Sequence, residues 1–451
     1  MKRERLGSRL GFILLSAGCA IGVGNVWKFP YMCGQYGGGA FVLIYLFFLI
    51  VMGAPVLTME FAMGRASQKS PVRLYQKLQP EGSKWHIHGY FAMAGNVILM
   101  MFYTTVAGWM LQYFYQTAKG DFVGADAEKV GSMFGEMLAD PVSMIIFMGI
   151  IVVISTLVCS LGVQNGLERV TKFMMIALMI IMVILAVNSI FMSGGSEGLK
   201  FYLIPSFEKM KDVGIGNVVV GAMNQSFFTL SLGIGAMAIF GSYIGKERAL
   251  LGEAVNVTIL DTFVAFVSGL IIFPACFAYG VQPDSGPSLI FITLPNIFNH
   301  ISMGRLWGSL FFVFMTFAAL STVLAVFENI IAMLMDLTGW ERKKTSLIVG
   351  VGIFVLSLPC IFGYNILSNI QPLGAGSTIM DLEDFAVSNI LLPLGSLIYV
   401  LFCVTRYGWG WKNFVAEANE GKGLKVASWM RPYCVFVLPV LIIAIFLIGI
   451  L

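Results

Sequence analysis

The strongest constraint on the fold is an apolar run of about 20 residues that recurs along the whole chain, because that length crosses the hydrocarbon core of a bilayer. The 451 residues are 58% hydrophobic and only 12% charged, whereas a soluble domain has about a quarter of its residues charged. Backbone polar groups inside lipid must bond within the protein, and a helix satisfies them within one segment. The sequence therefore predicts an all-α membrane protein.

We expect eleven transmembrane helices in a single domain over residues 1–451, because no polar stretch is longer than a loop. The predicted spans cover residues 10–35, 38–63, 88–116, 141–161, 167–193, 215–244, 253–280, 304–337, 345–363, 382–405 and 431–451. Residues 283–300 are apolar in their middle but too short to cross. They are expected to form a partly helical external loop that packs back onto the protein.

Basic residues gather in alternate loops, which predicts the orientation of the chain. Most of the 28 Lys and Arg residues fall on the side that holds the N-terminus, and cytoplasmic loops carry such an excess. The N-terminus is therefore expected in the cytoplasm, and eleven spans place the C-terminus outside. The N-terminal stretch has neither the length nor the cleavage site of a secretory signal peptide.

Composition argues against several classes of function. A net charge of +4 is too small to make nucleic acid an expected partner. The seven cysteines and three histidines are scattered and form no CxxC pair, so neither a metal centre of these residues nor a disulfide framework is expected. The spans lack paired aspartates, a HExxH motif and a Ser/His dyad, and we expect no enzymatic activity.

Two spans carry glycines in their middle, where helices are weakened. Gly18, Gly22 and Gly24 lie in the first span, and Gly233 and Gly235 lie in the sixth. Close helix packing is one explanation for such glycines. Matched breaks in corresponding positions of two halves indicate a transport site at the membrane midplane. The halves would be inverted repeats of five spans, about 10–193 and 215–405, followed by an extra span at 431–451.

An opened helix offers two kinds of binding group at membrane depth. Its freed carbonyl oxygens can coordinate a cation, and the N–H groups at the start of the next half-helix can hold a carboxylate. An amino acid zwitterion bound together with a sodium ion needs both groups at once. The broken spans therefore favour sodium-coupled amino acid binding.

Five motifs make this interpretation specific. They are RLGFILLSAGCAIGVGNVWKFP from residue 9, GQYGGGAFVLIY from 34, GAPVLTMEFAMGR from 53, FFTLSLGIGA from 227 and FITLPNIF from 291. Together they cover the chain in order, and the sequence resembles the neurotransmitter:sodium symporter family, in particular its eleven-span bacterial leucine and hydrophobic amino acid transporters. The resemblance implies a sodium-coupled importer of the bacterial inner membrane, a monomer or weak oligomer in the bilayer. An amino acid sensor or gated channel on the same scaffold is the alternative.

The resemblance implies two sodium sites. The first would take ligands from Ala20, Asn25, Thr229 and Asp261. The second would take ligands from Gly18, Ile21, Ala318, Ser321 and Thr322. Hydroxyls in membrane helices also bond back to their own backbone, which is the alternative role for the last two. In the family the substrate carboxylate completes the first site, so ion and substrate binding would be coupled.

Asp261 departs from the family, where many members have Asn at this position. An ionisable residue in mid-membrane marks a functional site by default, although an Asp that only caps a helix or faces water is the alternative. Relatives that bind chloride have a Ser where this sequence has Ala265, and some bacterial relatives have a Glu there. We therefore expect Asp261 to supply the negative charge and transport to need no chloride. Protonation of Asp261 after sodium leaves would permit proton counter-transport.

The resemblance also implies the substrate pocket. Its predicted lining is Cys19, Ala20, Gly22, Val23, Gly24, Leu99, Tyr103, Phe228, Thr229, Ser231, Ile234, Thr322 and Val326. This lining is apolar, so a charged substrate side chain would be left unpaired. Ile234 and Val326 are smaller than the residues of the bacterial leucine transporter at these positions, which favours larger hydrophobic or aromatic L-amino acids.

Two gates are expected from the same resemblance. Lys28 would face Asp384 outside, and Arg3 would face Asp336 inside with support from Tyr243. Ordinary snorkelling or surface charge is the alternative for these residues. Relatives also have a Pro ten residues after Gly166, which lets the fifth span unwind at its cytoplasmic end. Ile176 replaces it here, so the sequence leaves the cytoplasmic release route open.

Overall fold

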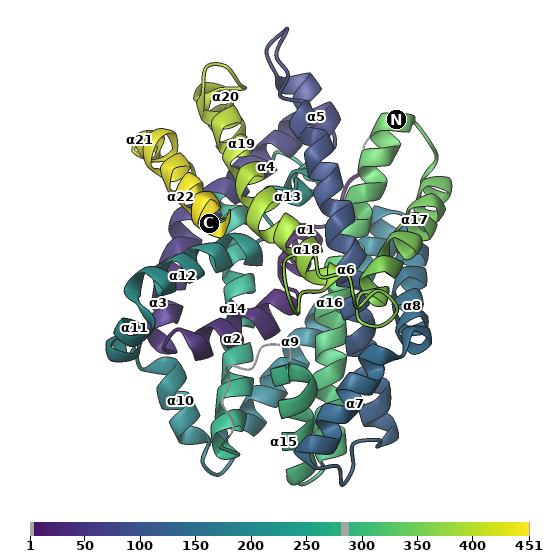
Figure 1. The fold of residues 1–451 in the computed structure, drawn as a ribbon. Helices are drawn as coiled ribbons and strands as arrows, with labels where there is room; N and C mark the ends of the chain where they lie inside the picture. The colour runs from purple at the N-terminus through teal and green to yellow at the C-terminus, as the bar shows by residue number, and fades with distance from the viewer. Residues whose placement is uncertain (1–3, 281–287, 451) are drawn as a thin grey trace.

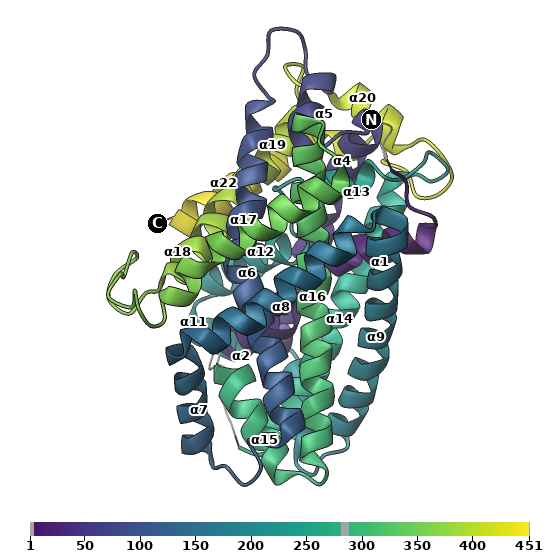
Figure 2. The same ribbon diagram turned by 90° about the vertical axis from the view of Figure 1, so that its right-hand side faces the viewer.

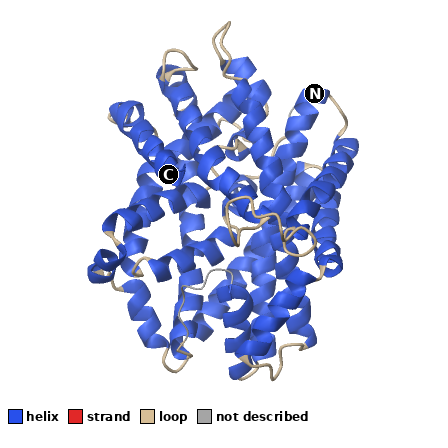
Figure 3. Ribbon diagram, in the orientation of Figure 1, coloured by secondary structure: helices blue, strands red, loops and turns tan. Residues whose placement is uncertain are grey.

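The computed structural model describes residues 4–280 and 288–450, and nearly all of its regular structure is helical (Figure 3). Strand pairing in these ranges is limited to two isolated bridges. The N-terminus, α5 (Pro71–Leu78) and α20 (Trp411–Ala418) lie at one end of the bundle, and α7 (Ala127–Ala139) lies at the other (Figures 1 and 2). The all-α prediction is confirmed.

Nine helical segments of the described chain are long and apolar enough to cross a membrane. They are Gly39–Ser67, Ile87–Lys119 (α6), Pro141–Ser160 (α8), Val163–Ile190, Leu250–Ala278 (α14), Gly304–Thr338 (α16), Arg342–Phe362 (α17), Ile379–Val404 and Met430–Ile450. A further crossing is a bent pair, α1 (Arg9–Ala20) with Gly24–Gln35, whose halves meet at 58°. Each of these segments matches a predicted span to within a few residues.

The predicted sixth span is divided into two helices. α12 covers Ile215–Thr229 and α13 covers Ala236–Gly241, and six non-helical residues separate them. The 15 residues of α12 rise only about 22 Å, less than the hydrocarbon core of about 30 Å. The prediction of eleven spans therefore holds only when α12 and α13 are taken together as one broken span.

Local sequence explains where several helices begin. The Ser8 hydroxyl caps α1 by accepting a hydrogen bond from the Gly11 amide. Asp140 caps α8 in the same way, with Pro141 in the first helical turn, where a missing N–H costs nothing. Thr378 begins α18 (Ile379–Phe385) with a capping box, in which two otherwise unpaired donors are satisfied reciprocally.

The centre of the bundle is α16, which packs against α1, α6, α8 and α9 (Arg169–Ile190) (Figures 1 and 2). Its apolar window is 83% buried, the largest share of any span. The apolar windows of α8 and of the last span are only 33% and 28% buried. These spans present apolar side chains such as Leu157 and Phe436 outward, as expected for helices that face lipid.

The predicted external loop packs back onto the protein in its described part. A π-helical turn at Leu289–Thr293 leads into α15 (Leu294–His300). The Phe291 ring lies 4.9 Å from the Tyr113 ring and 5.1 Å from the Phe134 ring, measured between centroids. The predicted partial helicity and packing are confirmed for residues 288–300, the external side of the loop stays a prediction, and residues 283–287 lie outside the described ranges.

A polar contact ties the connection after the tenth span to the body of the protein. The fully buried Arg65 guanidinium pairs with the Glu417 carboxylate of α20 at 2.6 Å and donates to the Arg248 carbonyl at 2.6 Å. Lys246 pairs with Glu420 at 2.9 Å, and the carboxylates of Glu420 and Glu417 raise the pKa of Lys246 above its ordinary value. The predicted loop 406–430 is therefore a docked, partly helical segment.

Candidate functional site

The two helix breaks face each other in the middle of the bundle. α1 ends at Ala20, and the next helical turn begins at Gly24. On the other side, α12 ends at Thr229, and Ser231 has a φ of 51°, rare for a residue other than glycine. The Ser231 hydroxyl donates to the Cys19 carbonyl at 3.3 Å. Non-helical backbone is thus concentrated between two spans, as tolerated in membranes only inside protein or beside water.

The glycines of the first break allow neighbouring side chains to pack closely against the backbone and also interrupt the helix. A Cβ atom at Gly22 would overlap the Tyr103 hydroxyl, and one at Gly24 would lie 2.6 Å from the Phe228 ring. In the second break, Gly233 has a φ of 95° and lies against the Leu392 carbonyl. The close-packing explanation and the broken-helix explanation are therefore both correct.

Asn25, Thr229 and Asp261 form what we call the charged cluster. The Asn25 amide donates to the Asp261 carboxylate at 2.8 Å and to the Thr229 hydroxyl at 3.1 Å. The Thr229 hydroxyl donates to the second carboxylate oxygen at 2.8 Å. All three side chains are at most 1% exposed, which excludes an Asp261 that faces water.

The charged cluster fits a monovalent cation. Within the described ranges Asp261 forms no ion pair with a Lys, Arg or His residue. A buried carboxylate without a cationic partner carries a large desolvation penalty. Two neutral hydrogen bonds offset only part of it, and a sodium ion beside Asp261 would supply the missing positive charge.

Five uncharged oxygens form a second group, which we call the neutral cluster. It consists of the carbonyls of Gly18, Ile21 and Ala318 and the hydroxyls of Ser321 and Thr322. The Thr322 hydroxyl lies 3.3 Å from the carbonyl oxygens of Gly18 and Ile21. Ser321 lies 2.9 Å from Ala318 on its own helix and 3.4 Å from Ile21 across the interface. Bonding to the helix's own backbone occurs for Ser321, but both hydroxyls also reach α1.

A buried cavity joins the two breaks. Eleven of the thirteen predicted pocket residues line it, and Val387 and Leu392 of the tenth span complete the lining. Val23 instead donates its backbone N–H to the Tyr103 hydroxyl at 2.8 Å, and Val326 is fully buried elsewhere in the core. The cavity holds only about 30 Å³, enough for about one or two waters.

Sequence reasoning missed Val387 and Leu392 for a geometric reason. A π-helical turn, Ala386–Leu391, widens the tenth span between α18 and α19 (Leu392–Val404). The turn shifts which side chains point inward, and a motif comparison does not reveal that shift. The one available signal was Pro393, since a proline in the first turn of α19 marks the start of a new helical segment.

The outer gate is not closed by an ion pair. The Lys28 ammonium lies 3.9 Å from the centroid of the Phe228 ring, within the range of a cation–π contact. Asp384 accepts a hydrogen bond from the Ser388 hydroxyl at 2.7 Å. The predicted contact between Lys28 and Asp384 is therefore absent from the ion pairs of the described residues. Lys28 instead lies over the Phe228 ring, which we call the lid.

The inner gate is described in part. Arg3 lies outside the described residues, so its predicted pairing with Asp336 is not seen. Asp336 accepts a hydrogen bond from the Ser70 amide at 2.7 Å and pairs with Lys69 at 3.7 Å. The Tyr243 hydroxyl donates to Glu328 at 2.6 Å, and its predicted support of the Arg3–Asp336 pair stays a prediction.

Arg342 forms an ion-pair network that sequence reasoning missed. Its guanidinium reaches the buried Glu328 carboxylate at 2.6 and 3.0 Å and Glu4 at 2.7 Å. The available signal was an acid inside α16 followed 14 residues later by an Arg at the start of α17. The pairing links the N-terminal segment to α16 and α17.

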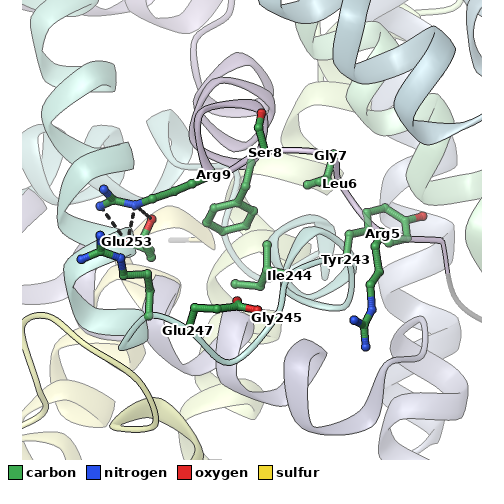
Figure 4. Close-up of a pocket in the computed structure, with 12 residues that line it drawn as sticks. Arg5, Leu6, Gly7, Ser8, Arg9, Tyr243, Ile244, Gly245, Glu247 and Glu253 are labelled. Atoms are coloured by element: carbon green, nitrogen blue, oxygen red, sulfur yellow. Dashed lines mark hydrogen bonds and ion pairs between the residues drawn. The ribbon is translucent and has the colours of Figure 1, made fainter.

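A second, larger cavity of about 500 Å³ lies between the N-terminal segment and the connection from α13 to α14. Arg9 and Glu253 pair at 2.9 Å on one side of it, and Arg5 and Tyr243 lie on the other (Figure 4). Its polar lining adjoins the inner gate. Sequence reasoning did not predict this cavity, because its walls come from segments far apart in the chain.

Comparison with known proteins agrees with this arrangement. The model of the sodium:neurotransmitter symporter family matches residues 3–130 and 128–451. The sodium-dependent transporter YhdH of Bacillus subtilis is 35% identical over 100% of this chain and 99% of its own length. A sodium-dependent transporter of Haemophilus influenzae is 30% identical over 99% and 98%.

A solved structure supports the same conclusion. The crystal structure of MhsT in complex with L-phenylalanine aligns with a TM-score of 0.88 and 36% identity, over 99% of this chain and 100% of that one. Similarity of this extent covers both helix breaks and every span between them. The chain, with its paired breaks and buried oxygen clusters, thus belongs to the sodium:neurotransmitter symporter family and is a sodium-dependent transporter.

Proposed function

We propose that the protein is a sodium-coupled importer of hydrophobic or aromatic L-amino acids that works by alternating access without chloride. The observation that carries the proposal is the charged cluster. It places an unpaired carboxylate against exposed backbone at both helix breaks, where a sodium ion and a zwitterion would bind together. The L-phenylalanine in the MhsT structure supports this substrate class.

The cavity lining favours an uncharged, apolar side chain. None of the residues that line the cavity carries a charge, so a substrate Lys or Glu side chain would lose its hydration without gaining a partner. The described volume is too small for an amino acid. Phe228 and the Lys28 side chain that covers it therefore move when substrate enters, and Lys28 then comes free to pair with Asp384.

Charge accounting favours chloride independence. The Tyr45 hydroxyl is buried near Asp261 and Thr229, and Ala265 offers no hydroxyl or carboxyl group of its own. A chloride ion there would be repelled by the Asp261 carboxylate, whereas a sodium ion at the charged cluster is already balanced by it. We also propose two bound sodium ions, one at each cluster. The proposed orientation places the N-terminus in the cytoplasm and the C-terminus outside.

Uptake into proteoliposomes tests the proposal. A sodium gradient is expected to drive accumulation of labelled L-phenylalanine above equilibrium, with the same rate in chloride and in gluconate. Accumulation that is absent in sodium, or that proceeds equally in potassium, would contradict coupling. A gated channel or sensor would bind the amino acid without concentrating it, so the same assay separates the alternatives.

A further inference from the structure

Glu383 is a buried acid that neither cluster nor cavity uses. It lies in α18 at the start of the tenth span and is only 4% exposed. Neither carboxyl oxygen makes a hydrogen bond of ordinary geometry, and the Cys360 thiol beside the carboxyl group is a weak donor. Among the described residues no Lys, Arg or His forms an ion pair with it.

The surroundings of Glu383 come from three elements. α18 packs against α6 and α17 and continues into the π-helical turn. The thiol of Cys360, from α17, lies next to the carboxyl group, and Tyr364 follows on the same side. On α6, the buried Thr105 hydroxyl also lacks a hydrogen-bond partner.

The other charged groups of the region are acids on the same helix. Asp381 is occupied by the capping box with Thr378, and Asp384 accepts from Ser388. Cys360 and Tyr364 are uncharged when protonated. The groups that face Glu383 therefore provide no positive charge to balance an ionised carboxylate.

This geometry decides the charge state. An ionised carboxylate buried without a partner is far more costly than the neutral acid, which has one donor and weaker hydration to lose. We propose that Glu383 is a proton-binding site, neutral while α18 is packed against α6 and α17 and ionised once water reaches it. A monovalent cation is the competing occupant, but one carboxyl group, a hydroxyl and a thiol make a poor set of ligands for it.

A proton bound in one conformation and released in another links pH to the position of the tenth span. The packed state holds the proton and the hydrated state does not, so low external pH stabilises the packed state and high pH favours opening. This consequence for transport rests on the proposed function. The occupancy of Glu383 by a proton does not.

Infrared spectroscopy of the purified protein tests the occupancy directly. A protonated carboxyl group gives a carbonyl stretching band that a carboxylate lacks. The difference spectrum between the wild type and Glu383→Gln is expected to contain this band near neutral pH, and Glu136→Gln, an exposed control, is expected to show none. A difference spectrum with only carboxylate bands, or one whose bands change when potassium replaces sodium, would overturn the proposal.

Stability keeps the proposal testable if the spectra are weak. The thermal midpoint of the wild type is expected to fall as pH rises from about 6 to about 9, because unfolding releases the proton that the packed state holds and higher pH favours that release. Glu383→Gln and Glu383→Leu, both permanently neutral, are expected to lose most of this decline. A decline of equal size in all three proteins would contradict a proton at Glu383.

Transport gives the functional readout. The apparent affinity of the wild type for external L-phenylalanine is expected to weaken as external pH falls, by at most about tenfold per pH unit for one proton. Glu383→Gln is expected to be independent of pH, and Glu136→Gln to follow the wild type. If the wild type transports nothing, the proposed function fails while the infrared result still decides the proton site. A Glu383→Gln variant that keeps the wild-type pH dependence would contradict the coupling.

Discussion

The charged cluster and the neutral cluster lie on either side of the same helix break, yet the sodium ions proposed for them would be held by different means. The charged cluster contains the Asp261 carboxylate, which has no cationic partner among the described residues. The neutral cluster contains five oxygens that already satisfy one another, as in the 2.9 Å bond from Ser321 to the Ala318 carbonyl. Loss of an ion would therefore leave an unbalanced buried charge in the charged cluster. In the neutral cluster it would leave oxygens that hydrogen-bond to one another.

This difference suggests separate roles. A cluster that tolerates being empty releases its ion readily when water enters. A cluster with a buried charge stays occupied until a second event, such as substrate departure or protonation, changes its electrostatics. The neutral cluster is thus suited to early release and the charged cluster to coupling with substrate.

The largest expected effect is that of Asp261→Asn. Removing the charge that balances sodium should weaken apparent sodium affinity about 100-fold, equal to about 3 kcal/mol, the low end for breaking a buried pair. Sodium-dependent binding of L-phenylalanine, titrated in chloride and in gluconate, measures it. Recovery by chloride would locate the missing charge at Asp261, and an unchanged titration in both salts would remove the distinction between the clusters.

Thr322→Val is expected to have a smaller effect at the neutral cluster. The change removes one hydroxyl that reaches three carbonyls of α1, worth about 1 to 1.5 kcal/mol or about tenfold in sodium affinity. The steepness of the sodium titration should also fall, because one of two ions binds poorly. Thr316→Val is the matched control, since its hydroxyl bonds only to Phe312 on its own helix, and it should titrate like the wild type.

Ser321→Ala should cost less again, about threefold to fivefold in sodium affinity. Its hydroxyl bonds mainly to its own helix and reaches Ile21 only at 3.4 Å. The same sodium titration measures it. A loss as large as that of Asp261→Asn would show that the neutral cluster depends on each ligand as strongly as the charged one does.

Lys28→Gln is expected to have the smallest effect, and it should leave both clusters unchanged. Losing the cation–π contact with Phe228 destabilises the conformation in which Lys28 covers Phe228 by about 0.5 to 1 kcal/mol. Dissociation of labelled substrate should therefore be about twofold to fivefold faster. Sodium affinity, measured at saturating substrate, should not move. A change in sodium affinity instead would tie the lid to the charged cluster.

Most of this site could be predicted from the sequence, because the family motifs identify the individual residues. Asn25, Thr229 and Asp261 were predicted together from the resemblance to the family, and the structure places them within 3.1 Å of one another. Val387 and Leu392 were missed because a π-helical turn decides which residues of the tenth span point inward. The pairing of Glu328 with Arg342 was missed because it depends on how two spans approach.

The fold was predicted to within a few residues for each long span, since a length of apolar sequence is set by the thickness of the bilayer. The structure of the segments that connect the spans was not predicted, because the bilayer sets no length for a polar segment. α20 is an example: its composition resembles any surface loop, and its position depends on contacts with distant residues such as the buried Arg65 and Lys246.

The contacts of Arg65 fix the connection between the tenth and eleventh spans against the rest of the protein. Arg65 joins the end of the second span to α20 and to the carbonyl of Arg248, just beyond Tyr243, and Lys422 continues the attachment through the Glu247 carbonyl at 3.0 Å. A tag or fluorophore inserted near residue 421 would therefore disturb the attachment of this segment to the connection between α13 and α14.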